Sequence, residues 1–256
     1  MATLLKQWGC LLTHLLIDAD ILVFRFASAF SKDEEIDWGG GLKSNVDNYE
    51  LATAQIDRFT KFLMSKTFST KATMCFTSKV NFRYGVLPTY KHNRTGMKKP
   101  RLMKSLIQYV KSNYPFKEKH GLEADDIMGI MATNETDSCI ATIDKDLLQI
   151  PGRHYNWNYG WMCHVEKEDA DNFFWQQCLS GDPGDGYHGI PGVGAKTAET
   201  ILSNIKDDDN IWNVIVQEYV KKGLTEEKAL QQARVARICR AENYDYNKGE
   251  VILWEP

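Results

Sequence analysis

The sequence THLLIDAD, residues 13–20, decides the fold. We interpret residues 13–18 as a buried strand, because a short apolar run ends there at an acid. Similar apolar runs with β-branched residues occupy 72–76 and 138–143. The long stretches between the runs have apolar residues at helical spacing, such as Ala52, Ile56, Phe59 and Leu63. This alternation predicts an α/β fold with a mainly parallel central sheet flanked by helices.

The composition is that of an ordinary globular chain. The 256 residues are 43% hydrophobic and 25% charged, enough to bury a core in one large domain or two small ones. The six cysteines have no paired spacing, so neither a zinc site nor a disulfide framework is indicated, and a reducing cytoplasm fits best. His14, Asp18 and Asp20 interrupt the apolar patches of residues 1–24, which argues against a signal peptide or a membrane span.

Acidic side chains recur in four groups along the chain: Asp18 with Asp20, Glu123 with Asp125 and Asp126, Asp144 with Asp146, and Asp182 with Asp185. Gathered carboxylates repel each other unless divalent cations neutralise them or some stay protonated. Asp18 and Asp144 each follow a predicted strand, and ligands collect at the carboxyl ends of parallel strands, so we expect these two acids to be neighbours. Each group alone can be a helix cap or a turn, but the four together predict a metal site.

Basic side chains are concentrated in one segment. The net charge is −3, yet residues 89–119 hold nine lysines and arginines against one acid, Glu118. This distribution predicts a segment that tracks phosphates or lines a groove, with a solvated basic face as the alternative.

The fourth acidic group leads into a glycine-rich run, residues 189–202, which we interpret as a hairpin between two helices. Gly192 and Gly194 let the backbone approach a ligand closely, and Lys196 and Thr197 begin a helix whose N–H groups can receive a phosphate. The pattern predicts a sequence-independent grip on the DNA backbone. The alternative is a plain glycine cap followed by a second helix.

The content and order of these motifs resemble those of the structure-specific 5′ nucleases, or flap endonucleases. The likeness covers roughly residues 12–205 and rests on Leu16–Asp20 with Phe24–Phe26, Tyr90–Arg94, Gly121–Asp126, Ile143–Asp146, Gly181–Asp185 and the glycine hairpin. Within that superfamily the chain is most similar to the 5′→3′ exonucleases of short-tailed phages, because Phe82–Arg83, Lys98–Pro100, Ala236–Ile238 and Ile252–Trp254 look similar too.

The resemblance implies a PIN-like 5′-nuclease fold and a division of the chain. An α/β nuclease core would span residues 1–170, with a helical arch at about 89–119. A helical C-terminal region would span residues 171–256, with a helix-hairpin-helix at about 186–205.

The resemblance also implies a two-metal phosphodiesterase. Two Mg²⁺ or Mn²⁺ ions roughly 4 Å apart can activate a water and stabilise the leaving oxygen of a phosphodiester. One ion would be held by Asp18, Glu123 and Asp125, and the other by Asp144, Asp146 and Asp182 or Asp185. Asp126 would lie between or behind them, as a further metal or catalytic residue.

Further residues are expected to touch nucleic acid. Lys91 and Arg94 would steady the scissile phosphate, and Tyr90 would stack on an unpaired base. The other expected DNA contacts are Arg25, Lys98, Lys99, Gly192, Gly194, Lys196 and Thr197. In the family a K⁺-type monovalent ion often sits at the hairpin.

From the same resemblance we expect a monomer with no membrane partner. It would act on DNA with a free 5′ end or a 5′ flap, or on RNA–DNA hybrids. Its place would be phage DNA replication or recombination in the cytoplasm of an infected bacterial host.

One departure and two alternative functions stay open. Many relatives carry a further Asp after the second strand, where this chain has Ser78, so we expect a raised metal requirement. Residues 15–20 also resemble the nucleophile strand of haloacid-dehalogenase-like phosphatases, with Asp18 as nucleophile and Asp20 as general acid. A DNA-binding protein with a decayed catalytic site is the other alternative.

Overall fold

The computed structural model describes residues 13–37, 43–135, 137–206 and 210–256. Its centre is a six-stranded sheet with the strand order β5, β4, β1, β6, β7, β8. These strands are Phe116–Lys117, Ser69–Cys75, Thr13–Asp18, Ser138–Thr142, Gly152–Asn156 and Trp161–Val165. All neighbours pair in parallel except β7 and β8, which form an antiparallel hairpin. The predicted mainly parallel sheet is confirmed.

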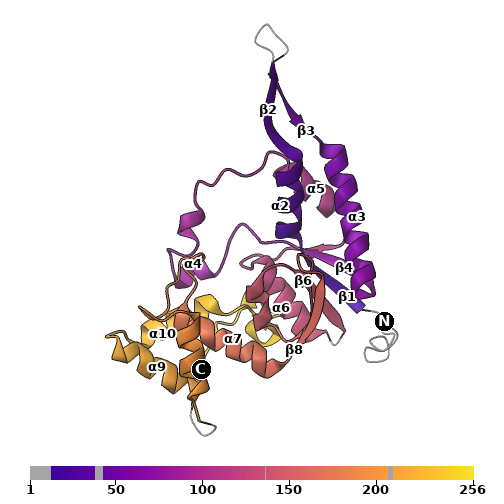
Figure 1. The fold of residues 1–256 in the computed structure, drawn as a ribbon. Coiled ribbons are helices and arrows are strands. Elements are labelled where there is room, and N and C mark those ends of the chain that lie inside the picture. Colours follow the sequence, from indigo (N-terminus) through magenta and orange to yellow (C-terminus); the bar gives the residue numbers. More distant parts are fainter. Residues whose placement is uncertain (1–12, 38–42, 136, 207–209) are drawn as a thin grey trace.

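Helices cover both faces of the sheet (Figure 1). Because side chains alternate along a strand, Leu15 and Ile17 of β1 face one side and Leu16 faces the other. The first side packs against three helices: α2 (Ala19–Phe30), α3 (Tyr49–Thr67) and α5 (Met103–Asn113). The second side packs against α6 (Ala124–Asn134) and against Ile238 and Cys239 near the end of the chain.

A separate buried cluster joins the C-terminal helices, which gather at one end of the molecule in Figure 1. They are α7 (Lys167–Ser180), α8 (Ala195–Ser203), α9 (Ile211–Lys221) and α10 (Glu226–Ala236), packed with the short α4 (Arg83–Val86). The chain then forms a 3-10 turn, Ala241–Asn243, and a short hairpin of β9 (Tyr244–Asp245) and β10 (Glu250–Val251). The division at residue 170 stays a prediction.

The basic segment, residues 89–119, is not one continuous helix. It contains the 3-10 turn η1 (His92–Arg94), an exposed stretch over residues 95–99 and then α5, whose Leu106 and Val110 are buried in the main core. Figure 1 shows the chain between α4 and α5 as an open loop. The segment expected to form the arch thus contains an exposed loop and a helix, and its contact with a ligand stays a prediction.

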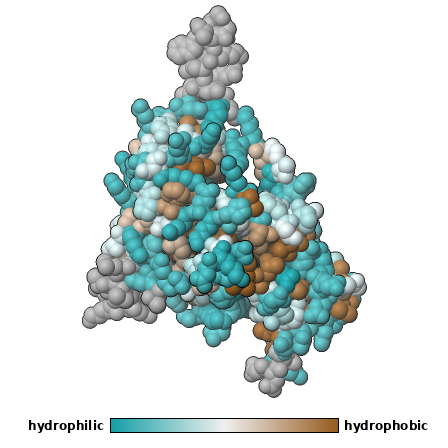
Figure 2. Space-filling view, turned by 180° about the vertical axis from the view of Figure 1, so that it is seen from behind, coloured by the Kyte–Doolittle hydropathy of each residue, from teal (hydrophilic) through white to brown (hydrophobic). Residues whose placement is uncertain are grey.

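Two further features complete the surface. A hairpin of β2 (Ser31–Asp37) and β3 (Lys43–Asp47) projects from the rest of the molecule (Figure 1). On the opposite view, hydrophobic residues gather mostly on the lower half and hydrophilic ones cover most of the upper half (Figure 2). Within the described ranges, no helix combines the length and the apolar character that crossing a membrane requires.

Candidate active site

The first two acids lie side by side because their strands are neighbours. Asp18 ends β1 and caps α2, accepting a hydrogen bond from the Ile21 N–H at 3.1 Å. Thr142 ends β6, donates to Asp18 Oδ2 at 3.0 Å and accepts from the Asp144 N–H at 3.0 Å. One hydroxyl thus ties the two strand ends together, and the predicted proximity of Asp18 and Asp144 is supported by this geometry.

The third acidic group begins α6, as the sequence predicts. Glu123 is the N-cap residue, and Asp125 and Asp126 lie in the first turn, where the helix dipole favours negative charge. Thr77, two residues after the end of β4, accepts from the Ala124 N–H at 3.0 Å, and its own N–H donates to Asp20 at 2.9 Å. The start of α6 is therefore fixed against the carboxyl ends of β1 and β4.

Asp126 pairs with a buried arginine, and its expected metal or catalytic role stays a prediction. It is fully buried and forms a two-pronged ion pair with Arg83, at 2.7 and 2.8 Å. Asp126 also accepts from the backbone N–H groups of Glu123 and Cys239. Burial alone would raise the pKa of Asp126, but the Arg83 guanidinium and these donors lower it below its ordinary value. Both carboxylate oxygens of Asp126 therefore already accept hydrogen bonds from protein donors.

The fourth group lies on the loop between α7 and α8. Two glycines with positive φ, Gly181 and Gly189, let this loop fold back on itself, since a Cβ at either would lie 2.3 to 2.5 Å from backbone atoms of the other arm. Asp182 Oδ1 accepts from the Gly184 N–H at 2.7 Å, and the Asp185 carbonyl accepts from the Lys91 N–H at 2.8 Å. The loop therefore joins the acids to the start of the basic segment.

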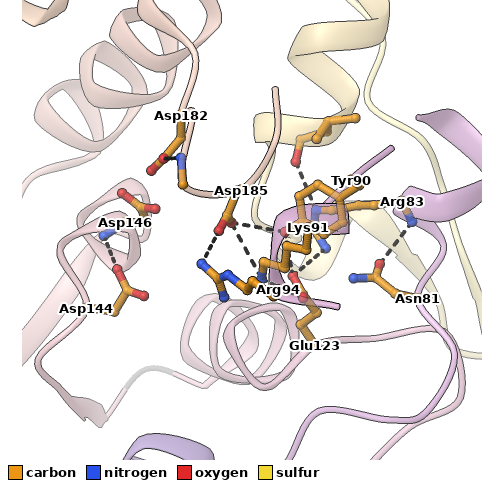
Figure 3. A network of polar contacts seen from close by, with 12 residues as sticks. Asn81, Arg83, Tyr90, Lys91, Arg94, Glu123, Asp144, Asp146, Asp182 and Asp185 are labelled. Atoms are coloured by element: carbon orange, nitrogen blue, oxygen red, sulfur yellow. Dashed lines mark hydrogen bonds and ion pairs between the residues drawn. The ribbon is translucent and has the colours of Figure 1, made fainter. Parts of the chain in front are cut away.

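Lys91 and Arg94 currently bind the acids that the sequence assigns to metals (Figure 3). The Lys91 Nζ lies 2.7 Å from Glu123 Oε1 and 3.5 Å from Asp185 Oδ2. Arg94 pairs with the other oxygen of Asp185. Burial would lower the pKa of Lys91, but Glu123 and Asp185 raise it overall, so its ammonium group stays charged.

Tyr90 is buried between acids of the site. Only 3% of the residue is exposed, and its hydroxyl donates to Glu123 Oε2 at 2.9 Å and to Asp185 at 3.2 Å. Its ring contacts Tyr84 and the Arg83 guanidinium. Tyr90 therefore links two acids here, and its stacking on an unpaired base stays a prediction.

Burial and neighbouring acids raise the pKa values of Asp18, Asp146 and Asp125. Burial and the charges of Asp20 and Asp144 raise the pKa of Asp18 from 3.8 to about 7. Burial and Asp144 likewise raise the pKa of Asp146 to about 6. The pKa of Asp125 rises well above its usual range, first through burial and then through Asp18 and Asp144. The negative charges of neighbouring acids repel one another, and a divalent cation bound among them would relieve this repulsion.

The donor set fits Mg²⁺ or Mn²⁺, since both prefer oxygen ligands. In the present positions, no three His, Cys, Asp or Glu side chains among the described residues converge closely enough to hold an ion. Figure 3 shows Asp144, Asp146 and Asp182 on one side and Glu123 and Asp185, bound by Lys91 and Arg94, on the other. Side-chain rotations would be needed to bring both sides onto shared ions.

The other predicted DNA-contact residues lie outside the contacts that join Tyr90, Lys91 and Arg94 to the acids. Arg25 on α2 is exposed, with its guanidinium over Phe59 and 3.4 Å from Asn158 Oδ1. Lys98 and Lys99 are exposed on the loop before α5. Gly192 has a φ of +80°, Gly194 caps α8, and Lys196 and Thr197 are exposed in its first turn. The predicted start of this helix is confirmed, and its role with DNA stays a prediction.

Ser78 does not point at the acids. Its hydroxyl accepts from the Gly121 N–H at 3.2 Å and from the Val80 N–H at 3.2 Å. Sequence reasoning also gave no role to Arg83, Thr142, Gln149 or Gln177, all of which touch the acids or their partners. Only Arg83 carried a signal, as part of the family likeness, because a neutral hydroxyl or amide in a helix or strand has no distinctive spacing.

Comparison with known proteins gives consistent matches. Residues 13–174 match the family model described as the 5′-3′ exonuclease, N-terminal resolvase-like domain. The chain is 28% identical to an exodeoxyribonuclease of Enterobacteria phage T3, over 94% of this chain and 92% of the relative. It is 31% identical to an exonuclease of Escherichia phage T7, over 72% of this chain and 73% of the relative.

Solved structures share the fold. A T5 5′-exonuclease with bound divalent zinc ions superposes with a TM-score of 0.64 at 17% identity, over 87% of this chain and 88% of that one. Together the matches favour a nuclease over the phosphatase and over the non-catalytic DNA-binding protein.

Proposed function

The chain belongs to the 5′-3′ exonuclease family, and from that membership we propose that it hydrolyses DNA from a 5′ end, and cuts 5′ flaps, with the help of two divalent cations. The observation that carries the metal-dependent part is the placement of the strand-end acids: the Thr142 hydroxyl ties Asp18 to the start of the segment that carries Asp144. Burial, together with the charge of Asp144, raises the pKa values of Asp18, Asp125 and Asp146. A buried group of acids of this kind is a natural binding place for Mg²⁺ or Mn²⁺.

Seven acids would hold the ions. Asp18 ends β1, and Glu123 and Asp125 lie at the start of α6. Asp144 and Asp146 follow β6, and Asp182 and Asp185 follow α7. When bound, the ions supply a more acidic water and stabilise the leaving oxygen. The T5 5′-exonuclease that shares this fold is described with divalent zinc ions bound, which supports the proposal.

Lys91 and Arg94 would exchange their partners during the reaction cycle. Each now pairs with an acid of the site, so each head group would lie beside a phosphate that binds to ions held by these acids. Once cations neutralise Glu123 and Asp185, the two basic groups would turn to the scissile phosphate and stabilise its developing charge. Thr142 would keep Asp18 and Asp144 in place throughout.

The DNA itself would be held by more distant groups. The exposed Lys98, Lys99 and Arg25 would contact the 5′ strand, and the start of α8 would bind duplex phosphates through backbone N–H groups. A monovalent cation such as K⁺ would bind at the hairpin before α8. A T5 flap endonuclease of the same fold is described in complex with DNA and metal ions.

The source of the relatives suggests a biological setting for the protein. The T3 and T7 relatives come from phages, so we propose a role in phage DNA replication or recombination in the host cytoplasm. The protein would act as a monomer on free 5′ ends, on 5′ flaps and on RNA–DNA hybrids.

A cleavage time course tests the function. Duplex and flap substrates, labelled at the 5′ or the 3′ end, are incubated with the protein in Mg²⁺ or in chelator. We expect release of 5′ label as short products in Mg²⁺ only, with 3′-labelled strands shortening progressively. Cleavage at full rate in chelator, or shortening from the 3′ end, would contradict the proposal.

A further inference from the structure

A chain of buried amides connects Asp146 to the backbone that follows α10. Gln177 on α7 is buried, and its Nε2 donates to Asp146 Oδ1 at 2.8 Å. The Gln177 Oε1 accepts from Nε2 of Gln149, which is buried on the 3-10 turn η2 (Lys145–Gln149). Gln149 Nε2 also donates to the Ala236 carbonyl at 2.8 Å, and its Oε1 accepts from the Ile238 N–H at 3.2 Å.

The Ile238 N–H and the Ala236 carbonyl fix the direction of the hydrogen bonds that link Gln149, Gln177 and Asp146. An N–H can only donate and a carbonyl can only accept, so Ile238 and Ala236 together allow one orientation of the Gln149 amide. That orientation directs the Gln149 Nε2 to Gln177 and therefore the Gln177 Nε2 to Asp146. The Gln177 Nε2 therefore acts as the donor to the Asp146 carboxylate.

The contact leaves one oxygen of the carboxylate available. Among the described residues, the side-chain donors near Asp146 are Gln177 at 2.8 Å and the mostly exposed Lys145 at 3.6 Å, and both meet Oδ1. A carboxylate held through one oxygen has a fixed plane, and its second oxygen can face a cation. Gln177 therefore does more than fill space in the core.

The same stretch of backbone also supports the opposite side of the site. Arg83 donates to the carbonyls of Val235 and Arg237 at 2.9 and 2.7 Å, and the Cys239 N–H donates to Asp126 at 3.0 Å. Residues 235–239 thus anchor partners of both Glu123 and Asp146. They lie beyond residues 13–174, which the family model matches, and so does Gln177.

We propose that Gln177 is a positioning residue of the nuclease: it orients the Asp146 carboxylate toward a divalent cation, and Gln149 with the backbone at Ala236 and Ile238 holds its amide in that orientation. The inference rests on the proposed metal role of Asp146. Hydrogen-bonding partners of metal ligands typically contribute 10–100-fold to metal affinity or activity.

Direct Mn²⁺ binding, followed by calorimetry on the full chain without DNA, tests the proposal. Gln177→Met keeps the length of the side chain and removes the donor. We expect its affinity for Mn²⁺ to fall roughly tenfold or more, with kcat reduced and KM for DNA unchanged. Gln176→Met, one residue earlier on the same helix, is the matched control, because Gln176 donates to the Ala195 carbonyl away from the acids; it should bind Mn²⁺ like the unchanged protein.

A double-variant comparison separates positioning from general packing. If Gln177 acts through Asp146, then Gln177→Met should cause no further loss of Mn²⁺ affinity in an Asp146→Asn background; losses that simply add would overturn the proposal. Should Gln177→Met fail to fold, Gln149→Met, which frees the Gln177 amide to rotate, is expected to show the same tenfold loss. Unchanged Mn²⁺ binding in the folded variant contradicts the positioning role.

The outcome for Asp146 alone shows which proposal has failed. If Asp146→Asn weakens Mn²⁺ binding and the glutamine variants do not, only the positioning role is wrong. If Asp146→Asn binds Mn²⁺ normally, the metal role of Asp146 is wrong and the inference fails with it.

Discussion

Two buried acids of this site have pKa values shifted in opposite directions. Asp126 is buried against a guanidinium, so the pKa of its carboxyl is lowered and its oxygens are occupied. Asp18 is equally buried but has acids beside it, so its pKa rises to about 7. A protein cation thus compensates the charge of Asp126, whereas Asp18 lies beside other acids, and this contrast supports the metal role proposed for Asp18.

Asp144 gives the most specific prediction for cleavage. Asp144→Asn should reduce the cleavage rate about 100-fold or more, equivalent to about 2.7 kcal/mol of lost transition-state stabilisation, while DNA binding in chelator stays intact. Single-turnover cleavage and a binding titration measure the two effects. The control is Asp169→Asn, at an exposed position in the first turn of α7. Turnover by Asp144→Asn near the level of this control would contradict the assignment.

The raised pKa values also predict how stability depends on pH. The folded protein binds protons at Asp18 and Asp146 more tightly than the unfolded chain, because their pKa values of about 7 and about 6 exceed 3.8. Stability in chelator should therefore fall as pH rises from about 4 to about 7. Mg²⁺ should raise the melting temperature more at pH 8 than at pH 5, because protons then compete less for the acids.

Thermal melts across this pH range provide the measurement. Asp18→Asn should flatten the fall in chelator, since this position then no longer titrates. The prediction is contradicted if the melting temperature of the unchanged protein in chelator rises steadily from pH 5 to pH 8. An equal effect of Mg²⁺ at both pH values would also contradict the raised pKa values of Asp18 and Asp146.

The strands and helices were largely predictable from the sequence, whereas their tertiary contacts were not. The apolar runs before Asp18 and Asp144 predicted parallel strands whose ends meet, and β1 and β6 do pair. The acids before the apolar part of α6 predicted a helix start, but adjacent Asp125 and Asp126 differ in role only because Arg83 reaches one of them. The amide contacts of Gln149 and Gln177 join residues far apart in the chain, which no local pattern reveals.

Arg83 connects three elements, so its loss should affect stability. It lies on α4, pairs with Asp126 on α6 and donates to the backbone after α10. Arg83→Met should reduce the free energy of unfolding by about 3–5 kcal/mol, because a buried carboxylate is left without its partner. Urea denaturation measures this loss.

Replacing both members of the pair provides the control for Arg83. Arg83→Met combined with Asp126→Leu removes both charges and should recover part of the loss. A single variant as stable as the unchanged protein would show that the ion pair does not hold these elements together.

Acidic and basic side chains gather on different parts of the molecule. The net charge is only −3, but the acids gather at one edge of the sheet while Lys98 and Lys99 lie on an exposed loop. Lys98→Ala with Lys99→Ala should weaken DNA binding and reduce the slope of log affinity against log salt by about 1–2. Binding isotherms at several salt concentrations measure the slope, with Mn²⁺ affinity unchanged.

A matched lysine pair checks that position matters rather than total charge. Lys221 and Lys222 lie at the end of α9. Their double alanine variant has the same net charge as the loop variant and should keep the salt slope of the unchanged protein. Equal slopes in both variants would argue against a specific role for the loop.

The metal site itself can be located by anomalous X-ray scattering from crystals soaked in Mn²⁺. We expect two Mn²⁺ peaks roughly 4 Å apart, between Asp18 and Asp125 on one side and Asp144 and Asp146 on the other. Lys91 should have moved away from Glu123. If crystals of protein that cleaves DNA in Mn²⁺ show no peak among these carboxylates at saturating Mn²⁺, the proposed catalytic site is wrong.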